Sequence, residues 1–154
     1  MIKVPKSNLE IKDFTNGHWI FPEKMDSQAY SGFIYVVRDN YFKQFYLGKK
    51  AYKGSRGKAR GVESNWKRYM SSSKHLEIMF AERPKSEFDF IVLEQYKMKG
   101  AVSYAETWTL CNVEAPTKAE WLNVRIEPVS WSVSEAVTDR HKDRLKRVIA
   151  LEKF

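Results

Sequence analysis

Two short runs of β-branched and aromatic residues, separated by a turn, constrain the fold of this chain more than any other feature. The first run spans 32–38 (GFIYVVR) and the second spans 43–48 (KQFYLG), with the turn-prone pair Asp39-Asn40 between them. Such residues favour strands, so the spacing predicts a β-hairpin. A loop of residues 40–41 or of residues 39–42 would place Tyr35 opposite Tyr46 on one face of the ribbon.

The sequence after the hairpin predicts helices around one more strand. Apolar residues recur at helical spacing in three segments, 63–70, 73–83 and 103–113. Residues 87–94 (EFDFIVLE) change from alternating to continuously apolar, as a central strand does. Residues 134–153 predict a basic amphipathic helix whose buried stripe is Val137, Leu145, Val148 and Ile149. Residues 1–30 show no such pattern and are interpreted as an irregular N-terminal arm.

The charge balance of the chain favours a polyanionic partner. Lys and Arg number 27 against 19 Asp and Glu, which gives a formal charge of +8 and attracts polyanions such as nucleic acid. The sole cysteine, Cys111, excludes an internal disulfide and a paired-cysteine metal site, and the three histidines lack ligand spacing. Since there is no apolar run of about 20 residues and no signal peptide, we expect a cytoplasmic protein without a membrane partner.

The strongest local charge feature is the segment 49–60 (KKAYKGSRGKAR), which contains no acidic residue. Its glycines and charges predict a mobile cationic loop. Such a loop could be a solvated linker, but the absence of acids favours contact with nucleic-acid phosphates. The residues expected to make these contacts are Lys50, Lys53, Arg56, Lys58 and Arg60.

The two predicted strands carry a resemblance. The pair GFIY (32–35) and YLG (46–48) resembles the signature of the GIY-YIG nuclease superfamily. Downstream, ESNWKRYMSSSKHL and then SYAE resemble, in order and spacing, the bacteriophage Seg-type subgroup of these endonucleases. The resemblance implies an α+β core in residues 31–126 with a small, mostly antiparallel three-stranded sheet flanked by helices. Residues 1–30 would then be an N-terminal arm and residues 127–154 a basic C-terminal helical extension.

The resemblance also implies the chemistry of the site. In this family one signature tyrosine acts as general base or positions the water, a glutamate binds a divalent metal, and a basic side chain holds the phosphate. Tyr35, Tyr46 and Glu106 match the tyrosine and glutamate positions, and the metal would be Mg²⁺ or Mn²⁺. A tyrosine with a pKa near its ordinary value of ~10 is a poor base, so Lys49, Lys50 or Lys67 would have to favour its phenolate.

The family arginine, one helical turn before a histidine or tyrosine, is not reproduced cleanly. The candidates for its role are Lys67 and Arg68, with Tyr69 beside them. A lysine cannot grip phosphate bidentately, so the role could also move to Arg56 or Arg60. An asparagine that orients the carboxylate in many relatives is matched by Asn123.

Each site residue also has a purely structural interpretation. Tyr35 and Tyr46 could be a cross-strand pair that only packs. Glu106 could close a capping box with Ser103. On a helical wheel Glu106 points away from the face formed by Tyr104, Trp108 and Cys111, which leaves it available to a cleft.

The C-terminal helix contains several basic residues: Arg140, His141, Lys142, Arg144, Lys146 and Arg147. It could contact a DNA groove, in particular through Arg144 and Arg147, or be an ordinary surface helix.

Taken together, these features predict a metal-dependent endonuclease that hydrolyses DNA, phage-encoded, of homing or host-DNA-degrading type, in the host-cell cytoplasm. The alternatives are an inactive GIY-YIG-like protein that binds nucleic acid or a partner, and an interaction protein that uses exposed tryptophans as an interface.

Overall fold

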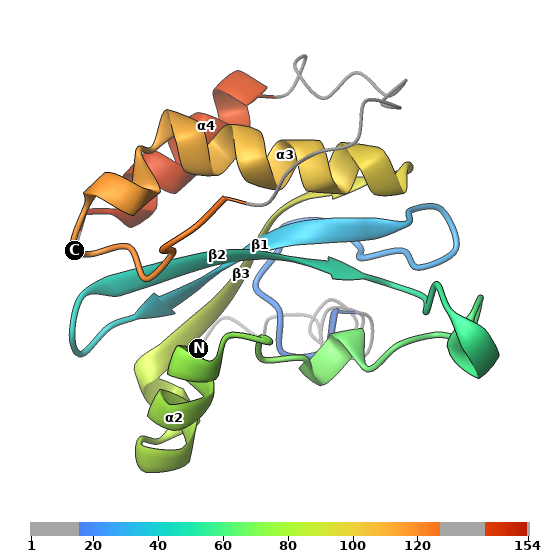
Figure 1. Cartoon of the computed structure of the whole chain (residues 1–154), viewed down its shortest axis with the longest axis horizontal. Helices are drawn as coiled ribbons and strands as arrows, with labels where there is room; N and C mark the ends of the chain where they lie inside the picture. The colour runs from blue at the N-terminus through green and yellow to red at the C-terminus, as the bar shows by residue number, and fades with distance from the viewer. Residues whose placement is uncertain (1–15, 127–140, 154) are drawn as a thin grey trace, which may run out of the picture.

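The computed structural model describes residues 16–126 and 141–153, which form an α+β fold around one three-stranded antiparallel sheet with the order β2-β1-β3. In Figure 1, α3 and α4 cover one face of the sheet and α2 lies on the other. The predicted fold class is confirmed. The strands are β1 (Gly32–Asp39), β2 (Gln44–Ala51) and β3 (Phe88–Tyr96), and the α-helices are α2 (Lys74–Glu82), α3 (Lys99–Asn112) and α4 (His141–Leu151).

The hairpin forms where expected, but its register differs from the prediction. The strands end at the pair Asp39 and Gln44, so the turn is 40–43, and Tyr35 lies opposite Gly48 instead of Tyr46. Asp39 stays in the strand because its Oδ1 accepts the backbone N–H of residues 41 and 42, at 2.9 and 3.1 Å. Lys43 then closes the turn with a left-handed φ of 57°. The register shift is two residues, so both tyrosines remain on one face.

The glycine of the YLG sequence is required by the tyrosine opposite it. The Tyr35 side chain crosses Gly48 so closely that an added Cβ would lie 2.5 Å from the Tyr35 hydroxyl oxygen. A larger residue at this position would force the tyrosine or the strand to move.

The sheet side under α3 and α4 is called here the aliphatic face. Its strand residues include Ile34, Val36, Leu47 and Leu93, and small residues of α3 pack on them. Ala101 and Ala105 are fully buried, which lets the helix approach the sheet closely. In α4, Val148 completes this core.

The opposite side, called here the aromatic face, carries Phe33, Tyr35 and Phe90 from the strands. Residues 16–31 and the segment between β2 and α2 cover most of it, with little regular structure. Ile20 pairs with β3 through two backbone hydrogen bonds, Ile20 N to Phe90 O at 2.7 Å and Val92 N to Ile20 O at 3.0 Å. The described part of the N-terminal arm therefore packs against the sheet.

Two predicted helices are confirmed and one is wrong. Ser73 caps α2, its side chain accepting from the N–H of Leu76, and α3 begins at Lys99, earlier than the predicted start. The predicted helix over 63–70 is only a 3₁₀ turn, Trp66–Arg68. Side-chain bonds replace the helical ones there, because the Trp66 carbonyl accepts from Trp19 Nε1 at 2.6 Å and Ser64 Oγ donates to the Ala51 carbonyl.

The strand predicted at 87–94 is confirmed as β3, and α4 lies within the predicted C-terminal helix. The first residues of that prediction, with Val137, lie outside the described residues. Ile149, predicted in the buried stripe, is 46% exposed. In the described parts of the chain, every helix is too short or too polar to cross a bilayer.

The basic segment is more regular than expected. Lys49, Lys50 and Ala51 belong to β2. The chain then turns back on itself, because Gly54 N donates to Val62 O and Gly61 N donates to Gly54 O, both at 2.9 Å. The charged side chains therefore sit on a closed loop instead of an irregular one.

Candidate active site

A cavity of about 520 Å³ opens at the edge of the sheet, beside β2. Four separate segments contribute to it: β2, the start of α2, the middle of α3, and residues 121–125. Its polar lining residues are Tyr46, Ser73, His75, Glu106, Asn123 and Arg125. Because β2 is an edge strand, the cavity can collect side chains from both faces of the sheet.

Residues 120–123 run beside β2 and form one wall of this cavity. Phe45 N donates to Glu120 O at 2.8 Å, and Leu122 N donates to Phe45 O at 2.7 Å. At the next step the Asn123 side chain continues the pattern, accepting from Leu47 N at 2.9 Å and donating to Leu47 O at 2.8 Å. The amide of Asn123 is thus engaged with the β2 backbone.

Glu106 reaches the cavity from the side of α3 that faces the sheet edge, and it is 8% exposed. The predicted capping box with Ser103 is wrong, because the helix starts four residues before Ser103 and its N-cap is Met98. Lys49 of β2 lies close to Glu106, with 3.7 Å between its Nζ and Glu106 Oε1. Lys49 Nζ also donates to Ser103 Oγ at 3.0 Å.

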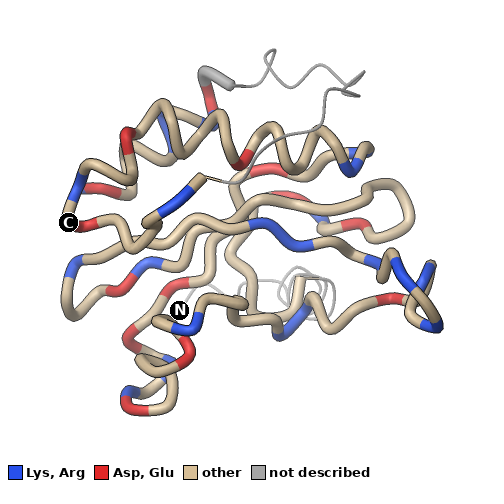
Figure 2. The backbone as a smooth tube through the Cα atoms, in the orientation of Figure 1, with Lys and Arg blue, Asp and Glu red and all other residues tan. Residues whose placement is uncertain are grey.

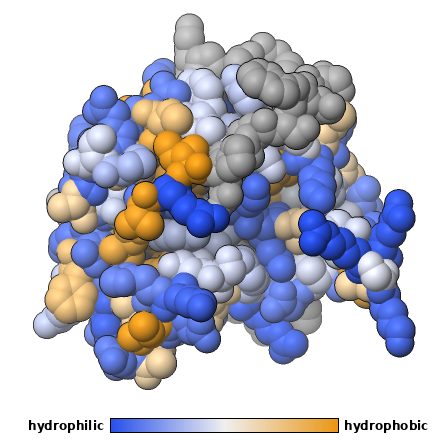
Figure 3. Space-filling view, in the orientation of Figure 1, coloured by the Kyte–Doolittle hydropathy of each residue, from blue (hydrophilic) through white to orange (hydrophobic). Residues whose placement is uncertain are grey.

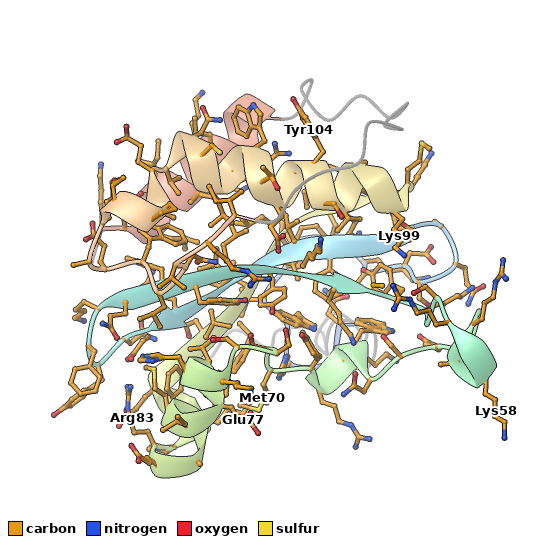
Figure 4. The ribbon with its side chains drawn as sticks, viewed as in Figure 1. Lys58, Met70, Glu77, Arg83, Lys99 and Tyr104 are labelled. Carbon is orange, nitrogen blue, oxygen red and sulfur yellow. The ribbon has the colours of Figure 1, made fainter. Side chains whose placement is uncertain are left out.

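The helical wheel correctly predicted that Glu106 lies on a different side of α3 from Tyr104 and Cys111. The side with Tyr104 and Cys111, however, is the exposed one. Tyr104 is 36% exposed and Cys111 is exposed. Figure 4 shows Tyr104 on the side of α3 away from the sheet. The face that packs is the one with Ala101, Ala105 and Glu106, so small residues and not aromatic ones mark it.

The two signature tyrosines have different environments. Tyr46 is half-buried and lines the cavity with Glu106. Tyr35 is 1% exposed, and burial raises the pKa of its phenol well above the ordinary value. The lysines expected to favour a phenolate are placed elsewhere, since Lys49 is beside Glu106, Lys50 lies over the Tyr69 ring and Lys67 lies over Trp66. Burial therefore opposes a base role for Tyr35.

The expected replacements for the family arginine are not among the residues that line this cavity. Lys67 and Arg68 line a separate open hollow together with Gly17 and His18. Tyr69 packs edge-on against Tyr35, with 6.1 Å between ring centroids.

The residues of segment 49–60 that were predicted to contact DNA differ in their exposure. Arg56, Lys58 and Arg60 are exposed, and Lys50 and Lys53 are half-buried. Figure 2 shows the positive charges of this segment along the second half of β2 and the loop after it, and Figure 4 shows Lys58 directed outward at the loop tip. The same loop projects as a hydrophilic extension in Figure 3.

The prediction that Arg144 contacts DNA is wrong. It is fully buried, donates to Thr109 Oγ1 at 3.1 Å and to the Tyr96 hydroxyl, and lies over the Trp108 ring. Its guanidinium therefore binds α4 to α3 and β3 and does not face solvent. Arg147 is partly exposed, with 3.9 Å between its Nη2 and Glu94 Oε2. Side chains at 140–142 lie outside the described residues.

Sequence reasoning did not propose His75, Ser73 or Arg125 for the site. His75 and Ser73 fall in SSSKHL and Arg125 in WLNVRI, stretches that were already matched or discussed. They have no regular spacing relative to Tyr46 or Glu106, so only the fold brings them together. The residue that could have been anticipated is Arg125, two positions after Asn123.

The metal-binding potential of the site rests on Glu106. Within residues 16–126 and 141–153, no three His, Cys, Asp or Glu side chains are grouped so as to hold a metal ion. A single carboxylate in an open cavity suits Mg²⁺, which keeps several waters and needs only one or two carboxylates together with substrate phosphates.

Comparison with known proteins identifies the family. Residues 19–126 match the family described as "Putative endonuclease segE, GIY-YIG domain". Searches of curated proteins and of solved structures gave no match. The match spans more than two thirds of the chain, including the cavity residues from Tyr46 to Arg125, and so the chain belongs to the segE-type GIY-YIG endonuclease domain family.

Proposed function

We propose that this protein is a metal-dependent endonuclease that hydrolyses phosphodiester bonds of DNA at the cavity beside β2. The observation that carries the proposal is the meeting of Tyr46, His75, Glu106 and Arg125 in one cavity, although they come from four separate segments. Family membership supports the same reaction class. The phage origin and the homing or host-DNA-degrading role belong to this proposal and rest on the family resemblance.

The residues of the cavity can divide the work of phosphodiester hydrolysis. That reaction needs a water that loses a proton, a group that neutralises the charged phosphorane, and a stabilised leaving oxygen. His75 is exposed in the cavity, and imidazole is the side chain that most often serves as a general base. We assign to His75 the role of accepting the proton of the attacking water, and to the Tyr46 hydroxyl the role of orienting that water.

Arg125 and Lys49 supply positive charge for the phosphate. The guanidinium of Arg125 can hold two phosphate oxygens at once, which a lysine cannot do. In this proposal Arg125 takes the role expected from Lys67 or Arg68. Lys49 lies next to Glu106 and balances part of its charge when the substrate is absent.

Glu106 would hold Mg²⁺ or Mn²⁺, with water and substrate oxygens as the remaining ligands. When bound, the metal supplies charge neutralisation at the phosphate. The chain itself contributes a fixed carboxylate, because Glu106 is buried in the packed face of α3 and cannot swing freely.

The decisive experiment is incubation of supercoiled plasmid with Mg²⁺, comparing the wild-type protein with Glu106→Ala and Glu106→Gln. We expect nicking by the wild type and a loss of at least about 1000-fold in both variants, because neither can hold the metal. DNA binding should remain in both. Unchanged plasmid with the wild type, over several DNAs and with both metals, would contradict the proposal.

The second candidate function is binding without cleavage. It is favoured by the ammonium of Lys49, which already places a positive charge 3.7 Å from Glu106. In that case binding would be independent of metal, and Glu106→Gln would leave every measurable activity unchanged.

A further inference from the structure

A second cavity, of about 200 Å³, lies between the end of β2 and the first turns of α3. Its lining includes Ser31, Lys49, Lys99 and Ser103. In Figure 4, Lys99 lies between the start of α3 and the sheet. Lys50 lines it as well, so three lysines from two elements, β2 and α3, meet two hydroxyl groups in one small space.

This cavity is adjacent to the Glu106 site. Ser103 and Glu106 are three residues apart on α3, so they lie on the same side of the helix about one turn from each other. Lys49 connects the two cavities, because its Nζ is 3.0 Å from Ser103 Oγ and 3.7 Å from Glu106 Oε1. A group bound in the smaller cavity would be next to the reaction site.

The lysines and hydroxyl groups of the cavity favour an anion of phosphate type. Lysine and serine donate hydrogen bonds to phosphate oxygens, and no acidic side chain is among the described residues that line the cavity. The first turn of α3 lines it too, and its N-cap, Met98, provides no capping side chain. The first N–H groups of a helix have no partner within the helix, and their partial positive charge adds to that of the lysines.

We propose that this cavity is a subsite for a backbone phosphate of the DNA, next to the phosphate that is cleaved. The assignment rests on the proposed function of the Glu106 site. The subsite would fix the register of the strand, because a neighbouring phosphate held at Lys99 and Ser103 leaves the scissile phosphate beside Glu106. Val102 and Ala51 add apolar surface to the lining, which suits the adjoining deoxyribose.

Equilibrium binding tests the subsite without any cleavage. The Glu106→Gln protein would be titrated against a fluorescent DNA duplex at several salt concentrations, alone and with Lys99→Gln or Lys97→Gln added. Lys97 is the matched control, since it is exposed, lies two residues away and is not among the residues lining the cavity. We expect Lys99→Gln to weaken binding about five-fold or more and to reduce the salt slope by about one. Lys97→Gln should change both far less.

Equal effects of the two substitutions would overturn the subsite, because they would show only loss of net charge. Thermal unfolding of each variant checks that the fold is kept. The test separates the two proposals: a selective Lys99 effect in a protein that never nicks DNA would keep a DNA-phosphate site at Lys99 and would reject the nuclease together with the placing of that site beside a cleaved phosphate.

The source of the phosphate is tested by NMR titration of the same protein with thymidine 3′,5′-bisphosphate, thymidine and inorganic phosphate. We expect the bisphosphate to shift the Gly100 and Ser103 amides, thymidine to leave them in place, and Lys99→Gln to weaken the bisphosphate effect. If inorganic phosphate alone shifts these amides and neither the bisphosphate nor DNA does, the assignment to a DNA backbone is wrong.

Discussion

The two faces of the sheet are built on different principles. The aliphatic face is covered by the regular helices α3 and α4, whose small and branched side chains pack on Ile34, Val36 and Leu47. The aromatic face is covered mainly by irregular segments, held by large rings and by side-chain hydrogen bonds such as that from Trp19 Nε1 to Trp66 O. The contrast shows that large rings and side-chain hydrogen bonds can hold a covering layer in place where most of that layer is not helical.

The proposed active site lies where the two faces meet. The helix on the aliphatic face supplies the carboxylate of Glu106, and the side of the sheet with aromatic residues supplies Tyr46 and His75. Each face alone therefore lacks part of the proposed chemistry, and substitutions on each should have distinct consequences.

The largest expected effect separates the two tyrosines of the aromatic face. Tyr46→Phe should reduce the nicking rate about 1000-fold, because we propose that the Tyr46 hydroxyl orients the attacking water. Tyr35→Phe should reduce the rate less than about ten-fold, because that hydroxyl is buried and bonds to Ser71 Oγ at 3.4 Å. Plasmid nicking rates measure both. A greater rate loss in Tyr35→Phe would reverse the assignment.

A somewhat smaller effect is expected on the aliphatic face, at Arg144. Arg144→Ala should lower the free energy of unfolding by about 3 kcal/mol, because it leaves a cavity and removes the donor to Thr109 and Tyr96. Urea unfolding measures the loss. The salt dependence of DNA binding should stay as in the wild type, and a shallower salt dependence would mean that Arg144 does contact phosphate.

On the aromatic face, His18 should make the stability of the protein depend on pH. Burial, assisted by the charge of Lys85, lowers the pKa of His18 from 6.5 to about 4. The unfolded chain therefore binds a proton at His18 more readily than the folded protein does. The stability that neutral His18 contributes to the fold is complete above pH 6.5 and is lost as the pH falls from 6.5 to about 4. We expect a loss of about 2 kcal/mol, after allowance for the partial exposure of the ring.

His18→Phe is the control for this pH effect, since the phenyl ring can keep the stacking on Phe90 at 4.3 Å between centroids. Unfolding free energies at pH 7 and pH 4.5 should differ less in this variant than in the wild type. An equal difference in both proteins would assign the acid sensitivity to other groups.

The smallest effect is expected in the basic loop, which belongs to neither face. Lys58→Gln should weaken DNA binding only two- to three-fold and should reduce the salt slope by about one, since it removes one exposed phosphate contact. Its stability should remain that of the wild type. Fluorescence anisotropy at several salt concentrations checks the slope, and an unchanged slope would make this loop a solvated linker.

The same contrast explains what the sequence could predict. The hairpin, β3 and the α-helices follow from alternation and helical spacing, and the α+β class was predicted correctly. The prediction of a helix over 63–70 was wrong. The apolar residues of this segment have helical spacing, but Trp66 and Ser64 form tertiary hydrogen bonds that replace the helical ones. A local sequence pattern cannot reveal a hydrogen bond between residues 47 positions apart, such as Trp19 and Trp66.

The site was predictable in part for similar reasons. Tyr46, Glu106 and Asn123 were identified from motifs that resemble the family, and the cavity contains all three. His75 and Arg125 were missed because only the path of the chain between β2 and α2, and the strand-like path of 120–123, bring them to the site. Arg144 was misplaced because a charged residue in a basic helix gives no sign of burial, which here depends on Thr109 and Tyr96.

The amide of Asn123 has a consequence for how copies of this chain behave toward one another. An edge strand offers unpaired backbone groups that can recruit a second molecule and start aggregation. Here the backbone N–H and carbonyl of Leu47 are hydrogen-bonded to the Asn123 side chain, and the carbonyl of Ala51 accepts from the Ser64 hydroxyl. At these positions of β2 the wall of the cavity therefore also hinders pairing with a second molecule. A chain that loses the Asn123 amide would expose part of this edge to aggregation as well as lose part of the site.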